Sequence, residues 1–328
     1  MIRRSIRYIV FSAIVALLSL PGFVQAAELK ELNFGIISTE SSVGLKSIWA
    51  PLLQDMERKL GMKVNTFFAS DYAGIIEAMR FNKIQLAWYG NKSAMEAVDR
   101  ANAEIFVQTV DRNGDPGYWS LLITHKDSAI QSVDDIIKNG KQYTFGNGDP
   151  NSTSGYLVPG YYVFALNNID PAKHFKRTVN SNHETNALAV ATKQVDFATN
   201  NTMDLSRLKK THPDYFQNIR IFWKSPLIPS DPIAWRKDLP EEMKAKIKSF
   251  FMNYGKTEQE LKVLAEIHNW GPFRESNNDQ LIPIRQLELF KEKVKIGNDA
   301  RLNAEEKRAK LAKIDADLTE LAKRAPIK

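Results

Sequence analysis

The sequence predicts an α/β protein with two similar lobes, and three observations lead to that fold class. Apolar β-type runs alternate with helical segments over residues 32–88 in the order β-α-β-α-β, which favours a mostly parallel sheet with helices on both faces. The same order returns over residues 143–202. Two extended runs, at residues 116–124 and 219–223, lie on either side of this second region.

The first region supplies three strands and two helices. Short apolar runs predict strands at residues 32–37, 64–68 and 84–88. The second helix begins at Asp71 and Tyr72. The apolar residues of the first helix are Leu45, Trp49, Leu52, Leu53 and Met56.

A shift of 111 positions (145 minus 34) superimposes the second region on the first without a gap. Any two units of this order share a periodicity, so architectural similarity alone is one interpretation. The other is a pair of like lobes that offer helix starts and strand ends to a shared cleft, with Tyr72 and His183 facing each other. The shift sets Phe34 on Phe145, Ser41 on Ser152, Gly44 on Gly155, Tyr72 on His183 and Ala87 on Ala198.

The two extended runs predict a hinge. The chain would leave the first lobe near Tyr118 and return near Asp231, so both residues are expected at the floor of the cleft. The first lobe then covers residues 27–120, the second lobe 121–230, and the return to the first lobe 231–328. The return contains a strand at 233–235 and helices at 241–254, 259–267 and 281–290. A final helix starts at Asn303 with apolar residues at 3-4-3 spacing, and its docking against its own lobe is favoured over dimerisation.

Residues 1–26 read as a cleaved signal peptide. Arg3, Arg4 and Arg7 precede an apolar run over residues 8–20, and small residues stand before the expected cleavage site after Ala26. An exported, soluble, periplasmic protein is therefore expected. The net charge of +7 falls to about +4 without the three leader arginines, which is too small to indicate a nucleic-acid partner but suits a small anion.

Residues 144–162 contain the strongest candidate for a binding site. A short strand meets a loop with Gly146 and Gly148, and the hydroxyl run Ser152-Thr153-Ser154 stands just before a helix start. Hydroxyls and free amides at a helix start can hold the oxygens of an anion, although an ordinary N-cap is the alternative. The run lacks the third glycine of a dinucleotide fingerprint and the lysine of a P-loop.

Other classes of function are weaker. A serine hydrolase could use Ser152 or Ser154 with His183 and Asp231, but the sequence has no G-x-S-x-G elbow. The five histidines form no i, i+4 pair and the chain has no cysteine, so neither a metal site nor a cofactor is expected. Only the final helix argues for a purely structural protein.

The segments described above, residues 149–155 above all, match those of a known family. The sequence resembles the periplasmic phosphonate-binding proteins of bacterial ABC transporters over essentially its whole length after residue 26. The resemblance implies a type II periplasmic binding protein fold, in which two α/β lobes on a two-strand hinge close on the ligand. It also implies delivery of organophosphonates to an inner-membrane permease. The matching segments are residues 33–38, 71–74, 87–91, 116–120, 146–155, 179–187 and 223–232, and residues 149–155 are the most specific.

The resemblance also implies the ligand-binding residues. Asp231 would accept a hydrogen bond from a ligand amine or from a protonated phosphonate oxygen. Relatives that bind aminoethylphosphonate often carry an acidic residue where this chain has Met203, which puts preference for an amine in question. Phosphite, phosphate or another small oxyanion is the alternative ligand. The aromatic residues Tyr72, Trp88, Tyr89 and Tyr118 either indicate room for an organic tail or belong to the core of a lobe, and the core is favoured for Trp88. The residues expected to hold the phosphonate oxygens are Tyr72, Tyr118, Ser152, Thr153, Ser154 and His183.

Overall fold

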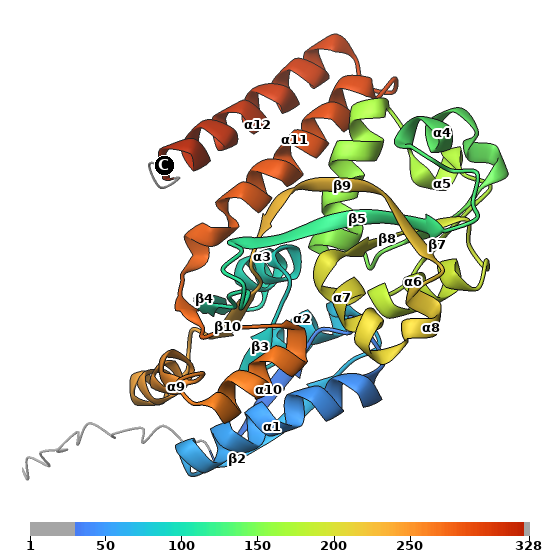
Figure 1. Ribbon diagram of the computed structural model, residues 1–328. Coiled ribbons are helices and arrows are strands. Elements are labelled where there is room, and N and C mark those ends of the chain that lie inside the picture. The colour runs from blue at the N-terminus through green and yellow to red at the C-terminus, as the bar shows by residue number, and fades with distance from the viewer. Residues whose placement is uncertain (1–29, 325–328) are drawn as a thin grey trace, which may run out of the picture. The chain divides into compact units, whose positions relative to one another are not determined.

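The computed structural model describes residues 30–324, and the expected signal peptide lies outside this range. The described chain is a mixed α/β fold with two β-sheets and a helical C-terminal region (Figure 1). The fold class expected from the sequence is therefore confirmed.

The first sheet has six strands in the order β11-β4-β10-β3-β1-β2. Strand β1 is parallel to β2 and β3, whereas β10 is antiparallel to β3 and β4. The strands are β1 (Glu31–Ile36), β2 (Lys63–Phe68), β3 (Leu86–Trp88), β4 (Ala103–Gln108), β10 (Pro232–Arg236) and β11 (Arg274–Glu275).

The second sheet has five strands in the order β7-β6-β8-β5-β9. Strand β6 is parallel to β7 and β8, whereas β5 is antiparallel to β8 and β9. The strands are β5 (Gly117–His125), β6 (Thr144–Asn147), β7 (Arg177–Asn180), β8 (Phe197–Asn201) and β9 (Ile219–Pro229).

The two sheets repeat one arrangement in register. In the first sheet Phe34 pairs with Leu86, and in the second sheet Phe145 pairs with Phe197. Both residues of the second pair lie 111 positions after those of the first, which is the shift that superimposes the two halves of the sequence. The similarity between the halves thus extends from residue pattern to strand pairing.

Helices connect the strands of each sheet. Those of the first part are α1 (Ser42–Leu60), α2 (Tyr72–Arg80) and α3 (Asn91–Arg100). Between β5 and β9 lie α4 (Val133–Lys138), η1 (Gly140–Gln142), η2 (Thr153–Leu157), η3 (Gly160–Phe164), η4 (Ala165–Asn167), α5 (Pro171–His174), α6 (His183–Ala191), α7 (Thr202–Thr211) and α8 (Pro213–Phe216). The chain ends with α9 (Glu241–Asn253), α10 (Glu258–His268), η5 (Asn278–Leu281), α11 (Ile282–Asn298) and α12 (Ala304–Arg324).

The chain passes between the sheets twice, after β4 and after β9. The two passages are adjacent, because Gly117 at the start of β5 pairs with Pro229 at the end of β9. A Cβ atom on Gly117 would lie 1.9 Å from the carbonyl oxygen of Ile228, so only glycine permits this approach. Strand β5 begins four residues before the expected boundary at 120/121, and the lobe boundaries themselves stay a prediction.

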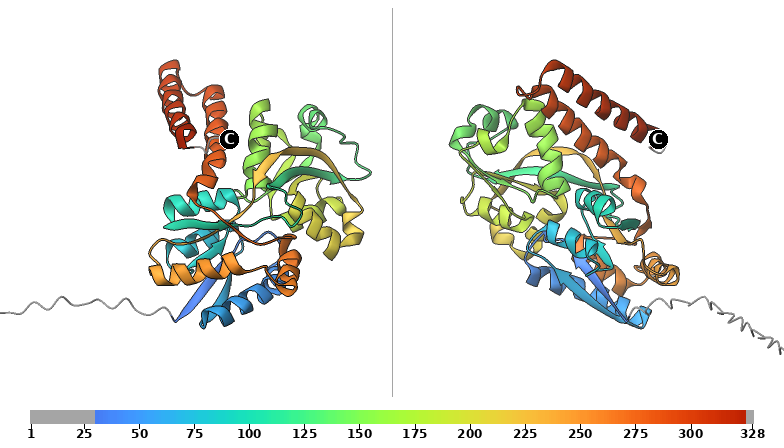
Figure 2. Two further views of the ribbon diagram at one scale, coloured as in Figure 1. Left: turned by 60° about the vertical axis from the view of Figure 1, so that its left-hand side comes forward. Right: turned by 180° about the vertical axis from the view of Figure 1, so that it is seen from behind.

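The C-terminal helices α11 and α12 pack against each other as a hairpin (Figures 1 and 2). Helix α11 runs to Asn298, eight residues beyond its expected end. Helix α12 starts after Asn303, whose side chain accepts from the amide of Glu306 while the Glu306 carboxylate accepts from the amide of Asn303. This reciprocal cap is the one that the sequence indicates.

Two neighbouring aromatic residues at the end of β3 point in opposite directions. Trp88 packs against Trp49 and Trp270 in the core of the first sheet. Tyr89 is fully buried and its hydroxyl donates to the carbonyl of Ile75, so it lies in the core, which is one of the two places that the sequence allows for it. Successive side chains of an extended chain point to opposite sides, so Trp88 and Tyr89 lie on opposite faces of the sheet.

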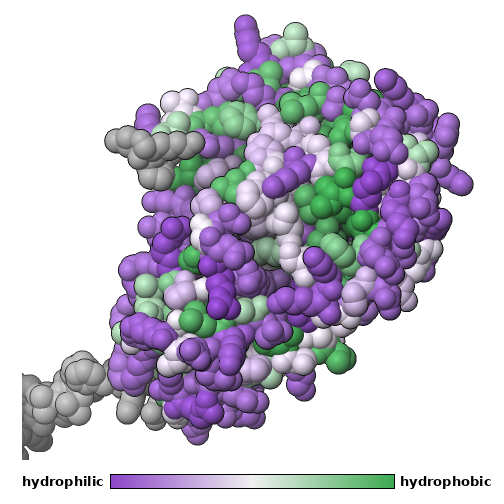
Figure 3. All heavy atoms as spheres, in the orientation of Figure 1, coloured by the Kyte–Doolittle hydropathy of each residue, from purple (hydrophilic) through white to green (hydrophobic). Residues whose placement is uncertain are grey.

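Hydrophobic side chains reach the surface over strands β5 and β9 (Figure 3). Ile221 and Leu227 of β9 expose 49% and 44% of their surface. Strand β9 is the edge of the second sheet, where one side of the strand lacks a neighbour.

Candidate functional site

The hydroxyl run lies in a tight turn between β6 and η2. Ser152 is the N-cap of η2, and its Oγ accepts a hydrogen bond of 2.9 Å from the amide of Gly155. The amide of Gly148 donates to the carbonyl of Gly155 at 3.0 Å, and a Cβ atom on Gly148 would lie 2.5 Å from that backbone. The glycine therefore lets the strand end and the helix start touch, which turns the hydroxyls inward.

A small cavity lies in front of this turn, with about 260 Å³ of space when the part open to solvent is included. It contains all seven residues that the sequence analysis names as ligand-binding, and they come from both sheets. Their role as ligands stays a prediction, but their convergence is a property of the fold. The lining residues are Ile37, Thr39, Tyr72, Trp88, Gly90, Tyr118, Ser152, Thr153, Ser154, His183, Asn201, Met203, Asp204 and Asp231.

Asp231 is a buried carboxyl group with two hydrogen-bond donors. The Tyr118 hydroxyl donates to its Oδ1 at 2.9 Å and the Asn91 side chain donates to the same atom at 3.3 Å. Burial raises the pKa of Asp231 to about 8, even though the bond from Tyr118 acts in the opposite direction. The group is therefore protonated at neutral pH and can donate through Oδ2.

His183 heads helix α6 and faces the hydroxyl run. Its Nε2 lies 3.4 Å from Ser152 Oγ and 3.5 Å from Ser154 Oγ. Burial lowers the pKa of His183, so the ring is neutral at neutral pH. No partner for its Nδ1 exists among residues 30–324.

Tyr72 opens helix α2 on the other side of the cavity. Its amide donates to Asp149 Oδ2 at 3.1 Å, which ties the first residue of α2 to the loop after β6. Burial, followed by the nearby charge of Asp204, raises the pKa of Tyr72 well above its ordinary value. Its hydroxyl therefore keeps its proton and can donate to an anion.

The predicted set of ligand-binding residues omits Thr39, Gly90, Asn201 and Asp204, which also line the cavity. Thr39 follows β1, and its buried Oγ1 has no hydrogen-bond partner in the described part of the chain. Asn201 ends β8 and donates to Ser154 Oγ at 3.2 Å and to Asp204 Oδ2 at 2.6 Å. Gly90 precedes α3, whose Lys92 amide donates to Thr153 Oγ1 at 2.8 Å. The sequence pattern that could identify these residues is the presence of polar residues directly after the parallel strands of each half, at one edge of the sheet.

The positions of the charged groups argue against a catalytic triad. Ser152 and His183 are neighbours, but the Asp231 carboxyl group accepts its hydrogen bonds from Tyr118 and Asn91 instead. His183 Nδ1 lacks the carboxylate that orients the base of a serine hydrolase.

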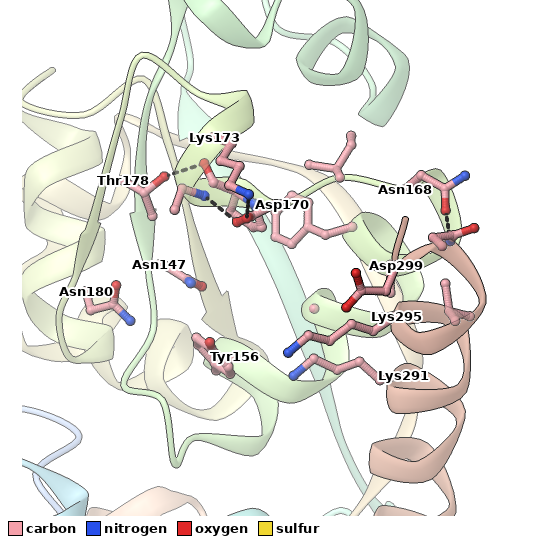
Figure 4. Close-up of a pocket in the computed structure, with 18 of the residues that line it drawn as sticks. Asn147, Tyr156, Asn168, Asp170, Lys173, Thr178, Asn180, Lys291, Lys295 and Asp299 are labelled. Carbon is pink, nitrogen blue, oxygen red and sulfur yellow. Dashed lines mark hydrogen bonds and ion pairs between the residues drawn. The ribbon is translucent and has the colours of Figure 1, made fainter. Parts of the chain in front are cut away.

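A larger groove lies elsewhere, between helix α11 and residues 147–180 (Figure 4). It holds about 1390 Å³ including open solvent, and none of the seven predicted site residues is among its lining residues. Lys291 and Lys295 extend from α11 towards Tyr156, with Lys291 Nζ 4.9 Å from the ring centroid (Figure 4). Because this groove is half open to solvent and contains none of the predicted residues, we assign the candidate site to the smaller cavity, where all seven converge.

Two further properties concern residues 30–324. No helix in this range combines the length and the hydrophobicity needed to cross a membrane. The same range contains no group of three or more His, Cys, Asp or Glu side chains arranged to hold a metal ion.

Comparison with known proteins assigns the family. Residues 34–281 match the family described as "ABC transporter, phosphonate, periplasmic substrate-binding protein". The chain belongs to this family. One relative is the phosphonates-binding periplasmic protein of Escherichia coli K12, with 62% identity over 292 residues, which cover 89% of this chain and 86% of that protein. The family consists of substrate-binding transport proteins rather than enzymes, so the hydrolase alternative is set aside.

Solved structures of the family share the fold. The binding protein component of a phosphonate ABC transporter from Pseudomonas aeruginosa is 60% identical, with a TM-score of 0.88 over 90% of this chain and 97% of that one. A Prochlorococcus marinus protein solved in complex with methylphosphonate has a TM-score of 0.70 at 21% identity, over 79% of this chain and 97% of that one. At that identity the likeness supports the fold alone.

Proposed function

We propose that this protein captures organophosphonates, of the 2-aminoethylphosphonate or alkylphosphonate class, and delivers them to an ABC permease. The observation that carries the proposal is the convergence of a hydroxyl run, two tyrosines, a neutral histidine and a protonated carboxyl group on one cavity. The family membership supports the same class of ligand.

The donors suit a tetrahedral anion. A phosphonate presents three oxygens, each of which accepts more than one hydrogen bond. The proposed donors are the hydroxyls of Tyr72, Tyr118, Ser152, Thr153 and Ser154, the ring of His183, the acid proton of Asp231 and the amides at the start of η2. The cavity lining contains no arginine, but hydroxyls and the amides of a helix start can bind such an anion without one.

We propose that the ligand is enclosed by hinge closure between a lobe of residues 27–120 and 231–328 and a lobe of residues 121–230. Contacts between the two parts support this. The Tyr72 amide reaches Asp149, and the Lys92 amide reaches Thr153. Each contact includes a residue that lines the cavity, Tyr72 or Thr153, so both would form as the lobes meet.

The charges in the cavity favour a ligand that carries its own cation. The Asp204 carboxylate lines it and Asp231 is protonated, whereas no lysine or arginine is among the lining residues, all of which lie within the described range. An anion enclosed with a carboxylate is repelled unless a positive charge accompanies it. We propose that Asp204 accepts from a ligand ammonium group, in place of the acidic residue that Met203 replaces. A small oxyanion such as phosphate or phosphite stays the alternative, and the modest cavity volume favours it.

The test is a titration of the purified protein with 2-aminoethylphosphonate, methylphosphonate, phosphite and phosphate. A ligand present at 100 times its dissociation constant should raise the melting temperature by roughly 5 °C, because it binds only the folded state. Intrinsic fluorescence should change as well, since Trp88 and two tyrosines line the cavity. The absence of any response at millimolar concentrations would refute the phosphonate assignment, and a stronger response to phosphate would favour the alternative.

The protonated state of Asp231 predicts a pH dependence. The pKa of Asp231 is about 8 in the folded protein and about 4 when the group is exposed, so the carboxyl group is protonated at pH 7. A bound phosphonate oxygen stabilises this protonated form further, because it accepts a hydrogen bond from it. As the pH rises above about 8 the proton is lost and the carboxylate repels the anion, so affinity for methylphosphonate should fall by up to about tenfold per pH unit. Asp231→Asn does not titrate and serves as the comparison, because the titration of the ligand itself is common to both proteins. Parallel pH profiles would contradict the prediction.

The proposed location of the protein is the periplasm. Membership of a periplasmic family supports export by cleavage of residues 1–26 and function beside an inner-membrane permease. A homodimer through the C-terminal helices stays a prediction. Helix α12 packs on α11, and Ile314, at 5% exposure, is the one buried side chain of α12. Sedimentation of the purified protein measures whether two copies associate.

A further inference from the structure

A buried ion pair joins the two parts of the chain beside the cavity. Glu40 lies between β1 and α1, and Arg207 lies on α7, 167 positions later. Arg207 Nε donates to Glu40 Oε1 at 2.7 Å, and the two side chains expose only 11% and 6% of their surface. Neither residue lines the proposed ligand cavity.

Three more hydrogen bonds cross between the same two parts of the chain. The Ser41 amide donates to Glu184 Oε2 at 2.9 Å, and the Glu184 amide donates to the carbonyl of Thr39 at 3.2 Å. Arg207 Nη1 also donates to the carbonyl of Glu266 at 3.4 Å, near the C-terminus of α10. The carboxylate of Glu184 thus lies at the N-terminus of α1, and the guanidinium of Arg207 lies at the C-terminus of α10. The helix dipole stabilises a negative charge at the first position and a positive charge at the second.

The charges around the pair make it dependent on closure. Glu40, His183, Glu184, Asp204 and Arg207 line one small cavity, in which Arg207 is the only lysine or arginine among the lining residues. Burial raises the pKa of Glu40 to about 7 although Arg207 acts in the opposite direction. Burial of the Glu40 carboxylate therefore costs more than its attraction to Arg207 returns, so the pair only partly offsets that cost and the contact is reversible.

We propose that Glu40, Glu184 and Arg207 form an interlobe latch that sets the affinity of the cavity for every ligand without touching any of them. The inference rests on the proposed function, in which the closed form holds the ligand. Separation of the lobes lets each charge return to water, so the latch acts only on the closed form. A weaker latch lowers the closed population and raises the apparent dissociation constant by the same factor for all ligands.

The test compares wild type with Arg207→Met, Glu40→Leu and the double variant Glu40→Leu/Arg207→Met. Arg207→Met leaves Glu40 buried without a partner and should weaken binding of methylphosphonate, 2-aminoethylphosphonate and phosphate by one common factor, about 10- to 100-fold. Faster release should account for the loss. The double variant removes both charges and should bind within a few-fold of wild type, because a well-packed apolar pair can replace a buried ion pair.

The matched control is Lys246→Met, which removes a cation from an exposed ion pair with Glu242 on α9 and should change nothing. The proposal fails if Arg207→Met binds like wild type, if it changes the ranking of ligands, or if the double variant is weaker than either single one. If wild type itself binds no ligand of the series, the proposed function fails instead. X-ray scattering of the free proteins then tests the latch alone: Arg207→Met should have the larger radius of gyration, and equal radii overturn the latch.

Discussion

The double variant Ser152→Ala/Thr153→Ala is expected to weaken binding of every ligand in the phosphonate series by about 100-fold or more. A hydrogen bond to a charged group contributes about 1.5–3 kcal/mol, so the loss of two corresponds to roughly 3–6 kcal/mol. Both side chains line the cavity and are almost fully buried, at 2% and 1% exposure, so water cannot easily replace the missing donors. Isothermal titration calorimetry measures the loss directly.

Both hydroxyls also have structural roles, which the experiment must separate from ligand binding. Ser152 caps η2 and Thr153 accepts from the amide of Lys92. Loss of an N-cap lowers the free energy of unfolding by about 1 kcal/mol. Thr257 is the matched control, because its Oγ1 accepts from the amide of Glu260 at the start of α10 and it lines neither cavity. Thr257→Ala should lose similar stability and keep full affinity. If the double variant loses stability but binds normally, these hydroxyls are caps only.

The sequence predicts this part of the molecule well because the signals are local. A strand, two glycines and a run of hydroxyls before a helix lie within a dozen residues, so backbone geometry alone brings Ser152 and Gly148 into place. The repeat of 111 positions works for the same reason, since Phe34 and Phe145 occupy equal positions in equal units.

The rest of the site depends on which strand ends meet, and that is a tertiary property. Asp204 enters the cavity because Asn201 caps α7 beside the hydroxyl run, and no pattern in residues 200–204 indicates that the carboxylate turns inward. The sequence does not decide between core and cleft for Tyr89, because an aromatic residue after a strand suits either. The pairing of Glu40 with Arg207 across 167 positions has no sequence signal at all.

The charge distribution of the cavity makes Asp204 the residue with the largest expected influence on the choice among ligands. Its Oδ2 accepts from Asn201, and its charge contributes, after burial, to the raised pKa of Tyr72 and of Asp231. The carboxylate is therefore close to the proposed phosphonate position yet separate from the hydroxyl run. That arrangement suits the amine end of a short aminoalkylphosphonate, with the anionic end in the hydroxyl run.

Asp204→Asn should weaken binding of 2-aminoethylphosphonate by roughly 10- to 100-fold, since it removes a hydrogen bond between charged groups. Binding of methylphosphonate should stay equal or improve, because the variant removes a negative charge near an anion. The asparagine can still accept from Asn201, so the helix start is kept. Met203→Glu should act in the opposite direction and favour the amine-bearing ligand, because it adds a carboxylate at a residue that already lines the cavity. If Asp204→Asn weakens both ligands equally, the carboxylate only positions Asn201 and Ser154, and the ligand amine is recognised elsewhere.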